Sequence, residues 1–231
     1  MEWAVSKVTD GDKLQFLKGT IIVIEGNIAS GKSTLTENLI NILAEDGLEA
    51  RLYKEPIMQS YLDAFIADQA KYAFGFQVAM LIKVQCMYID ALEFVKSGGI
   101  AILDRSFLGN KVFAEVQRNA GNISEEEFKI YESVFRDIRD FPDPDYIVYL
   151  MVDPRMNVVR CNRRNRSTEA SSYTLDYFQS LNDTYDDVMA EMDDTQNIIR
   201  LDWTEELPTD ELQLNGAHWV LNSLRDNFKS V

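Results

Sequence analysis

Residues 19–35 read GTIIVIEGNIASGKSTL, and this stretch decides the expected fold class. Its apolar run, Ile21 to Ile24, is typical of a buried strand, whereas the apolar residues after Lys32 recur at helical spacing. The loop between them matches the pattern G-x-x-x-x-G-K-[ST] in full, in the strand, loop and helix context that the pattern requires. We therefore predict a phosphate-binding loop.

Glycines in such a loop let backbone N–H groups point at phosphate oxygens, and the following helix N-terminus adds partial positive charge. We expect Lys32 to reach the β- and γ-phosphates of ATP and the Ser33 hydroxyl to bind Mg²⁺. The alternative is a glycine-rich turn that serves geometry alone, but the complete motif favours the phosphate site. The residues predicted to bind the nucleotide here are Gly26, Asn27, Ile28, Ala29, Ser30, Gly31, Lys32, Ser33 and Thr34.

The composition is that of one large α/β domain. The chain has 231 residues, of which 46% are hydrophobic, enough for a sizeable core. Its two cysteines, Cys86 and Cys161, lie far apart and lack metal-ligand spacing, which favours a reducing compartment. No apolar run reaches the length of a membrane span, and no signal or transit segment is recognisable. We expect a soluble, cytoplasmic protein without a membrane partner.

The net charge of −15 argues against a nucleic-acid partner, because nonspecific binding to nucleic acid depends on many cationic side chains. Positive charge is nevertheless concentrated in one segment, where five arginines fall within twelve residues. They are Arg155, Arg160, Arg163, Arg164 and Arg166. A solvated basic helix face is one interpretation, and a cluster that binds the phosphates of the nucleotide is the interpretation that the phosphate loop favours.

Strands and helices alternate along the chain, which predicts a parallel sheet flanked by helices. Residues 1–18, an N-terminal leader, and the acidic stretch 202–214 show no periodicity, so we expect both to be surface or partly ordered segments. We expect one domain over residues 19–231. The predicted strands are 21–24, 50–53, 100–103, 146–152 and 197–201, and the predicted helices begin after Lys32 and at about residues 72, 124, 154, 173 and 215.

Residues that end these strands should form the site, because ligands of such sheets bind beyond the carboxyl ends of the strands. Glu55, after the second strand, is the expected general base, since a hydroxyl acceptor must lose a proton as it attacks phosphate. Its alternative role is an acidic residue at the start of the next helix. Asp104 is predicted to bind Mg²⁺, and Arg105 to contact phosphate oxygens. His218 lies in the last helix, far from every strand end.

Five motifs taken together resemble the deoxynucleoside kinase family over about residues 19–203. They are IEGNIASGKST, Glu55-Pro56, YAFGFQ at 72–77, Asp104-Arg105-Ser106 and RNRSTE at 164–169, and the stretches GNISEEEFKIY and YFQSLNDTYDD are similar to its bacterial and viral branch. The resemblance implies a P-loop kinase fold with a five-stranded parallel sheet and an arginine-rich lid at about 160–172. It further implies that Gln77 binds the base edge, that Arg160, Arg164 and Arg166 bind the donor phosphates, and that Glu169 contacts the sugar 3′-hydroxyl.

Other substrate contacts implied by the resemblance are Tyr61, Ile66, Met80, Val84, Asn110 and Phe113. Ile66 stands where the family usually has a tyrosine, and Val84 and Asn110 stand near positions where purine- and cytosine-preferring members tend to carry arginine and aspartate. These smaller, less charged residues favour thymidine or broad pyrimidine use. From the residues alone, Phe113 is either a ring that stacks on the base or a core aromatic residue.

The expected activity is therefore transfer of the ATP γ-phosphate to the 5′-hydroxyl of a deoxynucleoside, and family members of this layout are usually homodimers. A thymidylate kinase or another nucleoside monophosphate kinase is one alternative, although Lys54 stands where thymidylate kinases typically carry arginine. A non-catalytic, kinase-like subunit of an assembly is another. A nucleotide switch protein is disfavoured because the chain has no Asn-Lys-x-Asp motif.

Overall fold

The computed structural model describes residues 11–138, 140–164, 173–204 and 210–229. Within them, five strands form one sheet in the order β2-β3-β1-β4-β5, and every neighbouring pair is parallel. The strands are β1 (Ile21–Gly26), β2 (Ala50–Tyr53), β3 (Ile100–Asp104), β4 (Tyr146–Met151) and β5 (Ile198–Asp202). The predicted five-stranded parallel sheet is thus confirmed, with the strand that precedes the phosphate loop at its centre.

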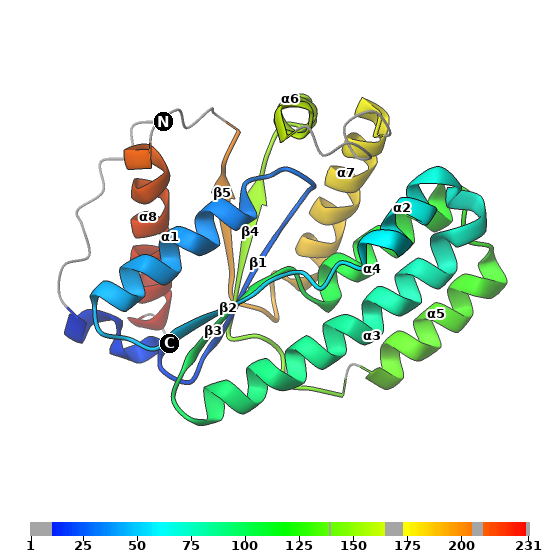
Figure 1. Ribbon diagram of the computed structural model, residues 1–231. Helices are drawn as coiled ribbons and strands as arrows, with labels where there is room; N and C mark the ends of the chain where they lie inside the picture. The colour runs from blue at the N-terminus through cyan, green and yellow to red at the C-terminus, as the bar shows by residue number, and fades with distance from the viewer. Residues whose placement is uncertain (1–10, 139, 165–172, 205–209, 230–231) are drawn as a thin grey trace.

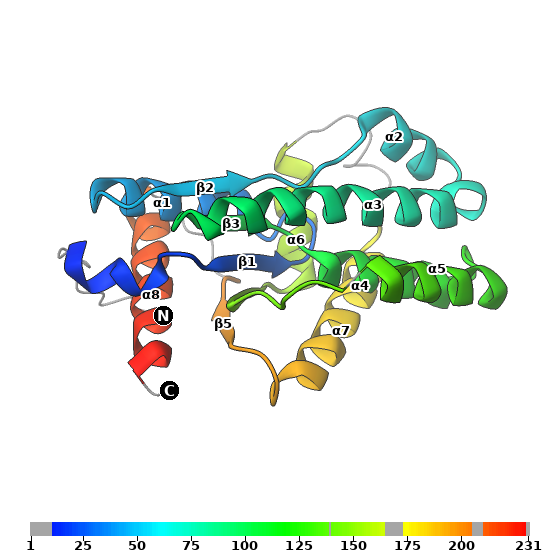
Figure 2. The same cartoon turned by 90° about the horizontal axis from the view of Figure 1, so that it is seen from below.

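Helices cover both faces of this sheet, with α1 and α8 on one side and α3, α4 and α7 on the other (Figure 1). The view from below shows α3 running along the sheet and continuing past it, with α4 and α5 beside this helix (Figure 2). The helices are η1 (Gly11–Leu17), α1 (Lys32–Glu45), α2 (Gln59–Ala67), α3 (Gln69–Lys96), α4 (Phe107–Asn119), α5 (Glu125–Ile138), α6 (Pro154–Arg164), α7 (Leu175–Met192) and α8 (Asp210–Lys229).

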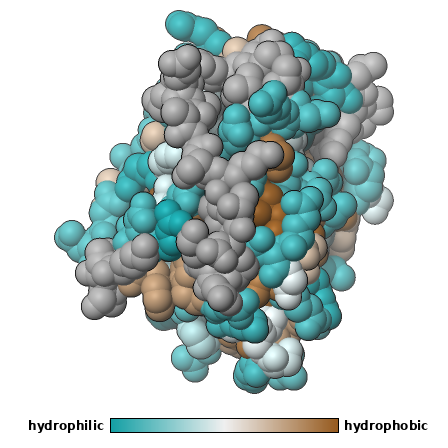
Figure 3. Space-filling view, turned by 90° about the vertical axis from the view of Figure 1, so that its left-hand side faces the viewer, coloured by the Kyte–Doolittle hydropathy of each residue, from teal (hydrophilic) through white to brown (hydrophobic). Residues whose placement is uncertain are grey.

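Alternation along β1 divides the core into two layers, because successive side chains of a strand point to opposite faces. Ile22 and Ile24 pack with α1 and α8, whereas Ile21 and Val23 pack with α3. By the same alternation, Glu25 faces the side of α4 and α7. The outer face of the α8 side carries mainly hydrophilic side chains (Figure 3). Among the described helices, none is both long and apolar enough to cross a bilayer.

Two local predictions of helix starts are confirmed by hydrogen bonds. Ser124 and Glu127 form a capping box, in which the Glu127 carboxylate accepts from the Ser124 backbone N–H at 2.8 Å. Asp153 caps α6 through the backbone N–H of Arg155, also at 2.8 Å. Helices α2 and α4 were not predicted, and α8 begins at Asp210, five residues before its predicted start at 215.

The expectation that residues 1–18 and 202–214 are surface or partly ordered segments is wrong for three side chains. Leu14 and Leu17 of η1 are fully buried in the core beside α8. Trp203, directly after β5, is 4% exposed and packs against the phosphate loop. Isolated apolar residues in these short stretches give no periodic signal, so only their tertiary contacts reveal that they are buried.

Candidate active site

The phosphate loop is built by close backbone approach at its two glycines. A Cβ atom on Gly26 would lie 2.9 Å from the Leu150 carbonyl oxygen, and one on Gly31 would lie 2.6 Å from Trp203 Nε1. Both glycines also have positive φ, at 147° and 100°, which disfavours other residues. The predicted strand, loop and helix are therefore present, and each glycine of the motif has a steric reason.

Lys32 lies folded over the loop, where its ammonium group donates to the carbonyl oxygens of Gly26 at 3.0 Å and Asn27 at 2.8 Å. Burial, together with the positive charge of Arg105, lowers the pKa of Lys32 to about 8. A phosphate group in the loop would replace these two carbonyl contacts and restore the ordinary preference of lysine for its charged form.

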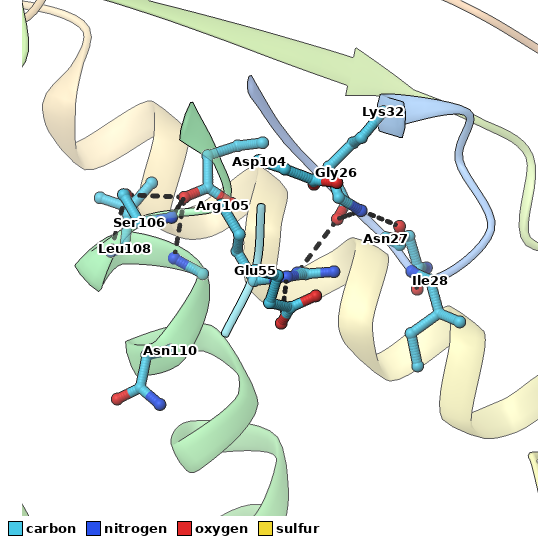
Figure 4. A network of polar contacts seen from close by, with 12 residues as sticks. Gly26, Asn27, Ile28, Lys32, Glu55, Asp104, Arg105, Ser106, Leu108 and Asn110 are labelled. Atoms are coloured by element: carbon cyan, nitrogen blue, oxygen red, sulfur yellow. Dashed lines mark hydrogen bonds and ion pairs between the residues drawn. The ribbon is translucent and has the colours of Figure 1, made fainter. Parts of the chain in front are cut away.

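Glu55 and Arg105 form an ion pair in front of the loop, with 2.9 Å between Glu55 Oε1 and Arg105 Nε (Figure 4). Arg105 also donates to the Gly26 carbonyl oxygen at 3.2 Å and to the Tyr185 hydroxyl at 2.5 Å. Burial alone would lower the pKa of Arg105, but nearby anionic groups, Glu55 foremost, raise it overall. The guanidinium therefore stays charged and keeps the carboxylate facing the cavity.

The backbone of Arg105 has φ of 77°, a left-handed conformation that is uncommon for residues other than glycine. Its N–H donates to the Ile24 carbonyl oxygen at 3.0 Å, which continues the bonding between β3 and β1 through the turn. The unusual backbone conformation thus occurs at a residue that contacts the predicted general base.

A buried carboxylate, Glu25, holds this turn and was missed by the sequence analysis. Its Oε1 accepts from the Ser106 N–H at 2.8 Å, the Ser106 hydroxyl at 2.7 Å and the Gly109 N–H at 3.1 Å. Its Oε2 accepts from Tyr185 at 3.1 Å. Burial raises the pKa of Glu25, against the opposing effect of Arg105. An acidic residue within an otherwise apolar strand was the available signal.

Asp104 and Ser33 meet beside the loop, with the Ser33 hydroxyl donating to Asp104 Oδ2 at 3.2 Å. The other carboxylate oxygen, Oδ1, is buried and has no hydrogen-bond partner within the described part of the chain. Oxygen ligands of this kind are the ones that Mg²⁺ prefers. The pair therefore fits a magnesium ion that is otherwise bound by water and phosphate oxygens.

One cavity of about 360 Å³ extends from these groups to the predicted nucleobase site. Lys32, Ser33, Glu55, Asp104 and Arg105 line it near the phosphate loop, together with Ile28 and Ala29 of the loop. Farther from the loop it is lined by Gln77, Met80, Val84, Asn110 and Phe113, which the sequence analysis named as substrate contacts. Arg164, at the end of α6, also faces it, whereas Arg166, Glu169 and most of the predicted lid lie outside the described residues.

Phe113 contacts both the cavity and Arg105, whose guanidinium carbon lies 4.6 Å from the ring centroid. This is a cation–π contact, so the ring helps to position the arginine and leaves cavity surface for a planar group. The cavity also includes aromatic residues that the sequence analysis did not select. They are Phe65, Phe76, Tyr173 and Tyr177.

Some predicted site residues do not line this cavity. Tyr61 instead packs edge-on against Phe76, with 5.9 Å between ring centroids, and Ile66 packs with the core layer of α3. Arg160 donates to the carbonyl oxygens of Ser30 at 3.1 Å and Trp203 at 2.7 Å, so it braces the loop from behind. Phe65, one position before Ile66, faces the cavity in its place.

The remaining loop residues also support the loop without lining the cavity. The side-chain amide of Asn27 donates to the Phe178 carbonyl oxygen at 2.9 Å and to Asn182 at 2.5 Å, both on α7. Ser30 is buried in this turn, whereas Gly31 beside it and Thr34 in the first turn of α1 are half-buried.

Comparison with known proteins identifies a family and several relatives. The family model described as deoxynucleoside kinase matches residues 22–216. A deoxyguanosine kinase of Dictyostelium discoideum is 33% identical over 213 residues, which cover 90% of this chain and 70% of the relative. A deoxyadenosine/deoxycytidine kinase of Bacillus subtilis is 28% identical over 173 residues, covering 73% and 76% of the two chains.

Among solved structures, a deoxyadenosine kinase from M. mycoides matches with a TM-score of 0.75 and 23% identity, covering 89% of this chain and 99% of that chain. This likeness confirms the expected P-loop kinase fold. Since the family model also spans most of the sequence and includes the phosphate loop, Glu55 and Arg105, the chain belongs to the deoxynucleoside kinase family.

Proposed function

We propose that this protein transfers the γ-phosphoryl group of ATP to the 5′-hydroxyl of a deoxyribonucleoside and so releases a deoxynucleoside monophosphate and ADP. The observation that carries the proposal is the Glu55 carboxylate, which Arg105 holds at 2.9 Å in the cavity that the phosphate loop also lines. A base beside the phosphate site suits an acceptor that is an alcohol, because the alcohol must lose its proton.

In the reaction, a bond forms between the 5′-oxygen and the γ-phosphorus while the bond to the β–γ bridging oxygen breaks. Glu55 takes the 5′-hydroxyl proton, and ADP leaves with the bridging oxygen. Lys32, released from the Gly26 and Asn27 carbonyl oxygens, binds the donor phosphates. Arg105 remains charged and lies between the Glu55 carboxylate and the phosphate loop, where it stabilises negative charge on the transferred phosphoryl group.

Ser33 and Asp104 would hold Mg²⁺, which in phosphoryl transfer neutralises charge on the phosphate oxygens. The unpartnered Oδ1 of Asp104 within the described residues supports this assignment. Arg164 faces the cavity from α6 and would bind the donor phosphates. We extend the same role to Arg166, and a sugar contact to Glu169, on the family resemblance alone.

At the far end of the cavity, Gln77 and Asn110 supply amide groups, and Met80, Val84 and Phe113 supply apolar surface. Neutral amides next to apolar walls suit a nucleobase, which needs hydrogen bonds in one plane and contact on its faces. The exposed fraction of Gln77 is only 2%. A nucleobase that contacts its amide group is therefore shielded from water.

A nucleoside monophosphate kinase would need cations for a second, acceptor phosphate. Glu55 occupies the space next to Arg105 and already neutralises that cation, which favours an uncharged acceptor. The test is a panel of the four deoxynucleosides, with ribonucleosides and the four deoxynucleoside monophosphates as matched controls, and with ADP release as the readout. Turnover of monophosphates alone would overturn the proposal, and no turnover with any acceptor would favour a non-catalytic subunit.

We further propose that the protein is a homodimer that pairs its long helices. Ile82 and Ile89, seven residues apart on one face of α3, are 46% and 43% exposed, and Ile130 on the neighbouring α5 is 54% exposed. Large apolar side chains aligned on one helix face suit a subunit interface. Light scattering should give a mass twice that of one chain. Replacement of Ile82 and Ile89 by glutamate should reduce the measured mass to that of a single chain.

A further inference from the structure

Three buried side chains form a chain of hydrogen bonds that ends at the cavity. The Tyr131 hydroxyl on α5 donates to Asn110 Oδ1 on α4 at 2.7 Å. Asn110 Nδ2 then donates to Gln77 Oε1 on α3 at 3.2 Å and to the Gln77 backbone carbonyl oxygen at 3.3 Å. The exposed fractions of the three residues are 1% to 5%, so water does not compete for these groups.

The direction of this chain is set by the backbone carbonyl oxygen of Gln77, which can only accept a hydrogen bond. If the Asn110 amide were turned over, its Oδ1 atom would face the Gln77 carbonyl oxygen, and neither atom could donate. The other end is equally directional, because burial raises the pKa of Tyr131 well above its ordinary value and the phenol stays a donor. Asn110 therefore presents its NH₂ group to Gln77, and both N–H bonds are used there.

This arrangement leaves Gln77 with its two amide atoms in unequal positions. Its Oε1 accepts from Asn110, whereas its buried Nε2 has no hydrogen-bond partner among the residues that the structure describes. Turning the Gln77 amide would bring two NH₂ groups together, which costs the bond and leaves buried donors unpaired. Gln77 lines the cavity, so the group left for a ligand is a hydrogen-bond donor.

We propose that Asn110, supported by Tyr131, is a positioning residue that locks the Gln77 amide with its donor available to the base and thereby sets base selectivity. The inference rests on the proposed function. The exocyclic group at pyrimidine C4 or purine C6 distinguishes the four bases at this donor. In thymine and guanine this group is a carbonyl oxygen, which accepts from the donor. In cytosine and adenine it is an amine, which places a second donor there unless the base shifts. Below, carbonyl-bearing and amine-bearing refer to this position only.

Asn110→Asp tests the lock because it keeps the shape of the side chain and removes its donor. The aspartate still accepts from Tyr131, but Gln77 must turn its own NH₂ group toward the carboxylate and expose Oε1 to the base. The measurement is kcat/KM for thymidine, deoxyguanosine, deoxycytidine and deoxyadenosine. The ratio of the two carbonyl-bearing substrates to the two amine-bearing ones should fall about tenfold or more, the size expected for one buried unpaired donor.

Tyr131→Phe provides a second, milder variant that keeps the ring. It removes the support of Asn110 but leaves the bond to the Gln77 backbone, so the same ratio should fall by a smaller factor, about threefold. The matched controls are Asn119→Asp, an exposed position on the same helix, and Tyr88→Phe, which loses a partly buried hydrogen bond to the Pro142 carbonyl oxygen at 2.8 Å. Neither control should change the ratio.

An equal loss of kcat/KM for all four substrates in Asn110→Asp would mean that Asn110 has only a structural role, and it would overturn the inference. A shift of selectivity toward carbonyl-bearing bases would overturn it as well. If that variant does not fold, an unchanged ratio in active Tyr131→Phe overturns it instead. A wild-type protein that phosphorylates none of the four substrates refutes the proposed function itself, whereas active enzymes with unchanged ratios refute only the lock.

Discussion

Replacement of Glu55 by glutamine removes a negative charge from the cavity while it preserves the size of the side chain. The ion pair that is lost joins Glu55 Oε1 to Arg105 Nε at 2.9 Å, and the Glu55 side chain is 23% exposed. Arg105 keeps its bonds to the Gly26 carbonyl oxygen and to Tyr185. We therefore expect the free energy of unfolding to fall by only about 1 kcal/mol, which is about 2–4 °C in Tm at this chain length.

Turnover should fall much further, by about two to four orders of magnitude, because the general base for the 5′-hydroxyl proton is gone. ATP affinity should stay within a few-fold, since the phosphate loop is unchanged. The assay is steady-state ADP release with the best deoxynucleoside, with calorimetry for ATP binding and thermal melts for stability. Glu93→Gln, an exposed α3 position that pairs with Lys96, is the control and should match the wild type in turnover.

Turnover of Glu55→Gln within tenfold of the wild type would refute the reasoning and remove Glu55 from the base role. A fall in Tm far beyond a few degrees would show instead that the pair with Arg105 is chiefly structural. The two outcomes are separable because turnover is measured well below the melting transition.

Three further predictions concern the groups around this pair. Gly109→Ala places a Cβ atom 2.4 Å from Arg105 Cγ and 2.7 Å from Glu25 Oε2, so we expect about 1–3 kcal/mol of destabilisation in melts and at least tenfold lower turnover. Burial raises the pKa of Glu25 above 4.5, so the folded state holds this proton at a pH where the unfolded state has lost it. The free energy of unfolding of the wild type, relative to that of Glu25→Gln, should therefore fall as the pH rises above 4.5. Parallel plots of unfolding free energy against pH for the two proteins would contradict this. Because burial lowers the pKa of Lys32 from 10.5 to about 8, unfolding free energy should rise by about 3 kcal/mol between these pH values relative to Lys32→Met, as denaturant titrations can measure.

The core elements of the fold follow from patterns that are local in sequence. The apolar runs of β1 and β3, the capping box at Ser124 and the N-cap at Asp153 each involve residues within one helical turn or one strand. Their physical basis is backbone hydrogen bonding and side-chain periodicity, which need no distant partner. The short helix α2 and the glycine-containing helix α4 have weaker local signals and were not predicted.

Within the candidate site, residues at strand ends were predictable because parallel strands bring their carboxyl ends to one edge. Lys32, Glu55 and Arg105 were placed correctly in one cavity by that rule. Side chains on helices were harder, because one position along a helix turns a side chain by about 100°. Phe65 faces the cavity where Ile66 was expected, and that difference depends on how α2 packs against α3.

The sequence by itself therefore determined the phosphate-loop motif, the parallel α/β architecture and the charged residues at strand ends that line one cavity. Only the tertiary structure decided that Arg160 braces the loop through Ser30 and Trp203, that Glu25 holds the turn around Arg105, and that Asn110 orients Gln77. Each of the latter depends on polar groups far apart in the chain that become partners when burial removes water, and no local pattern records such a pairing.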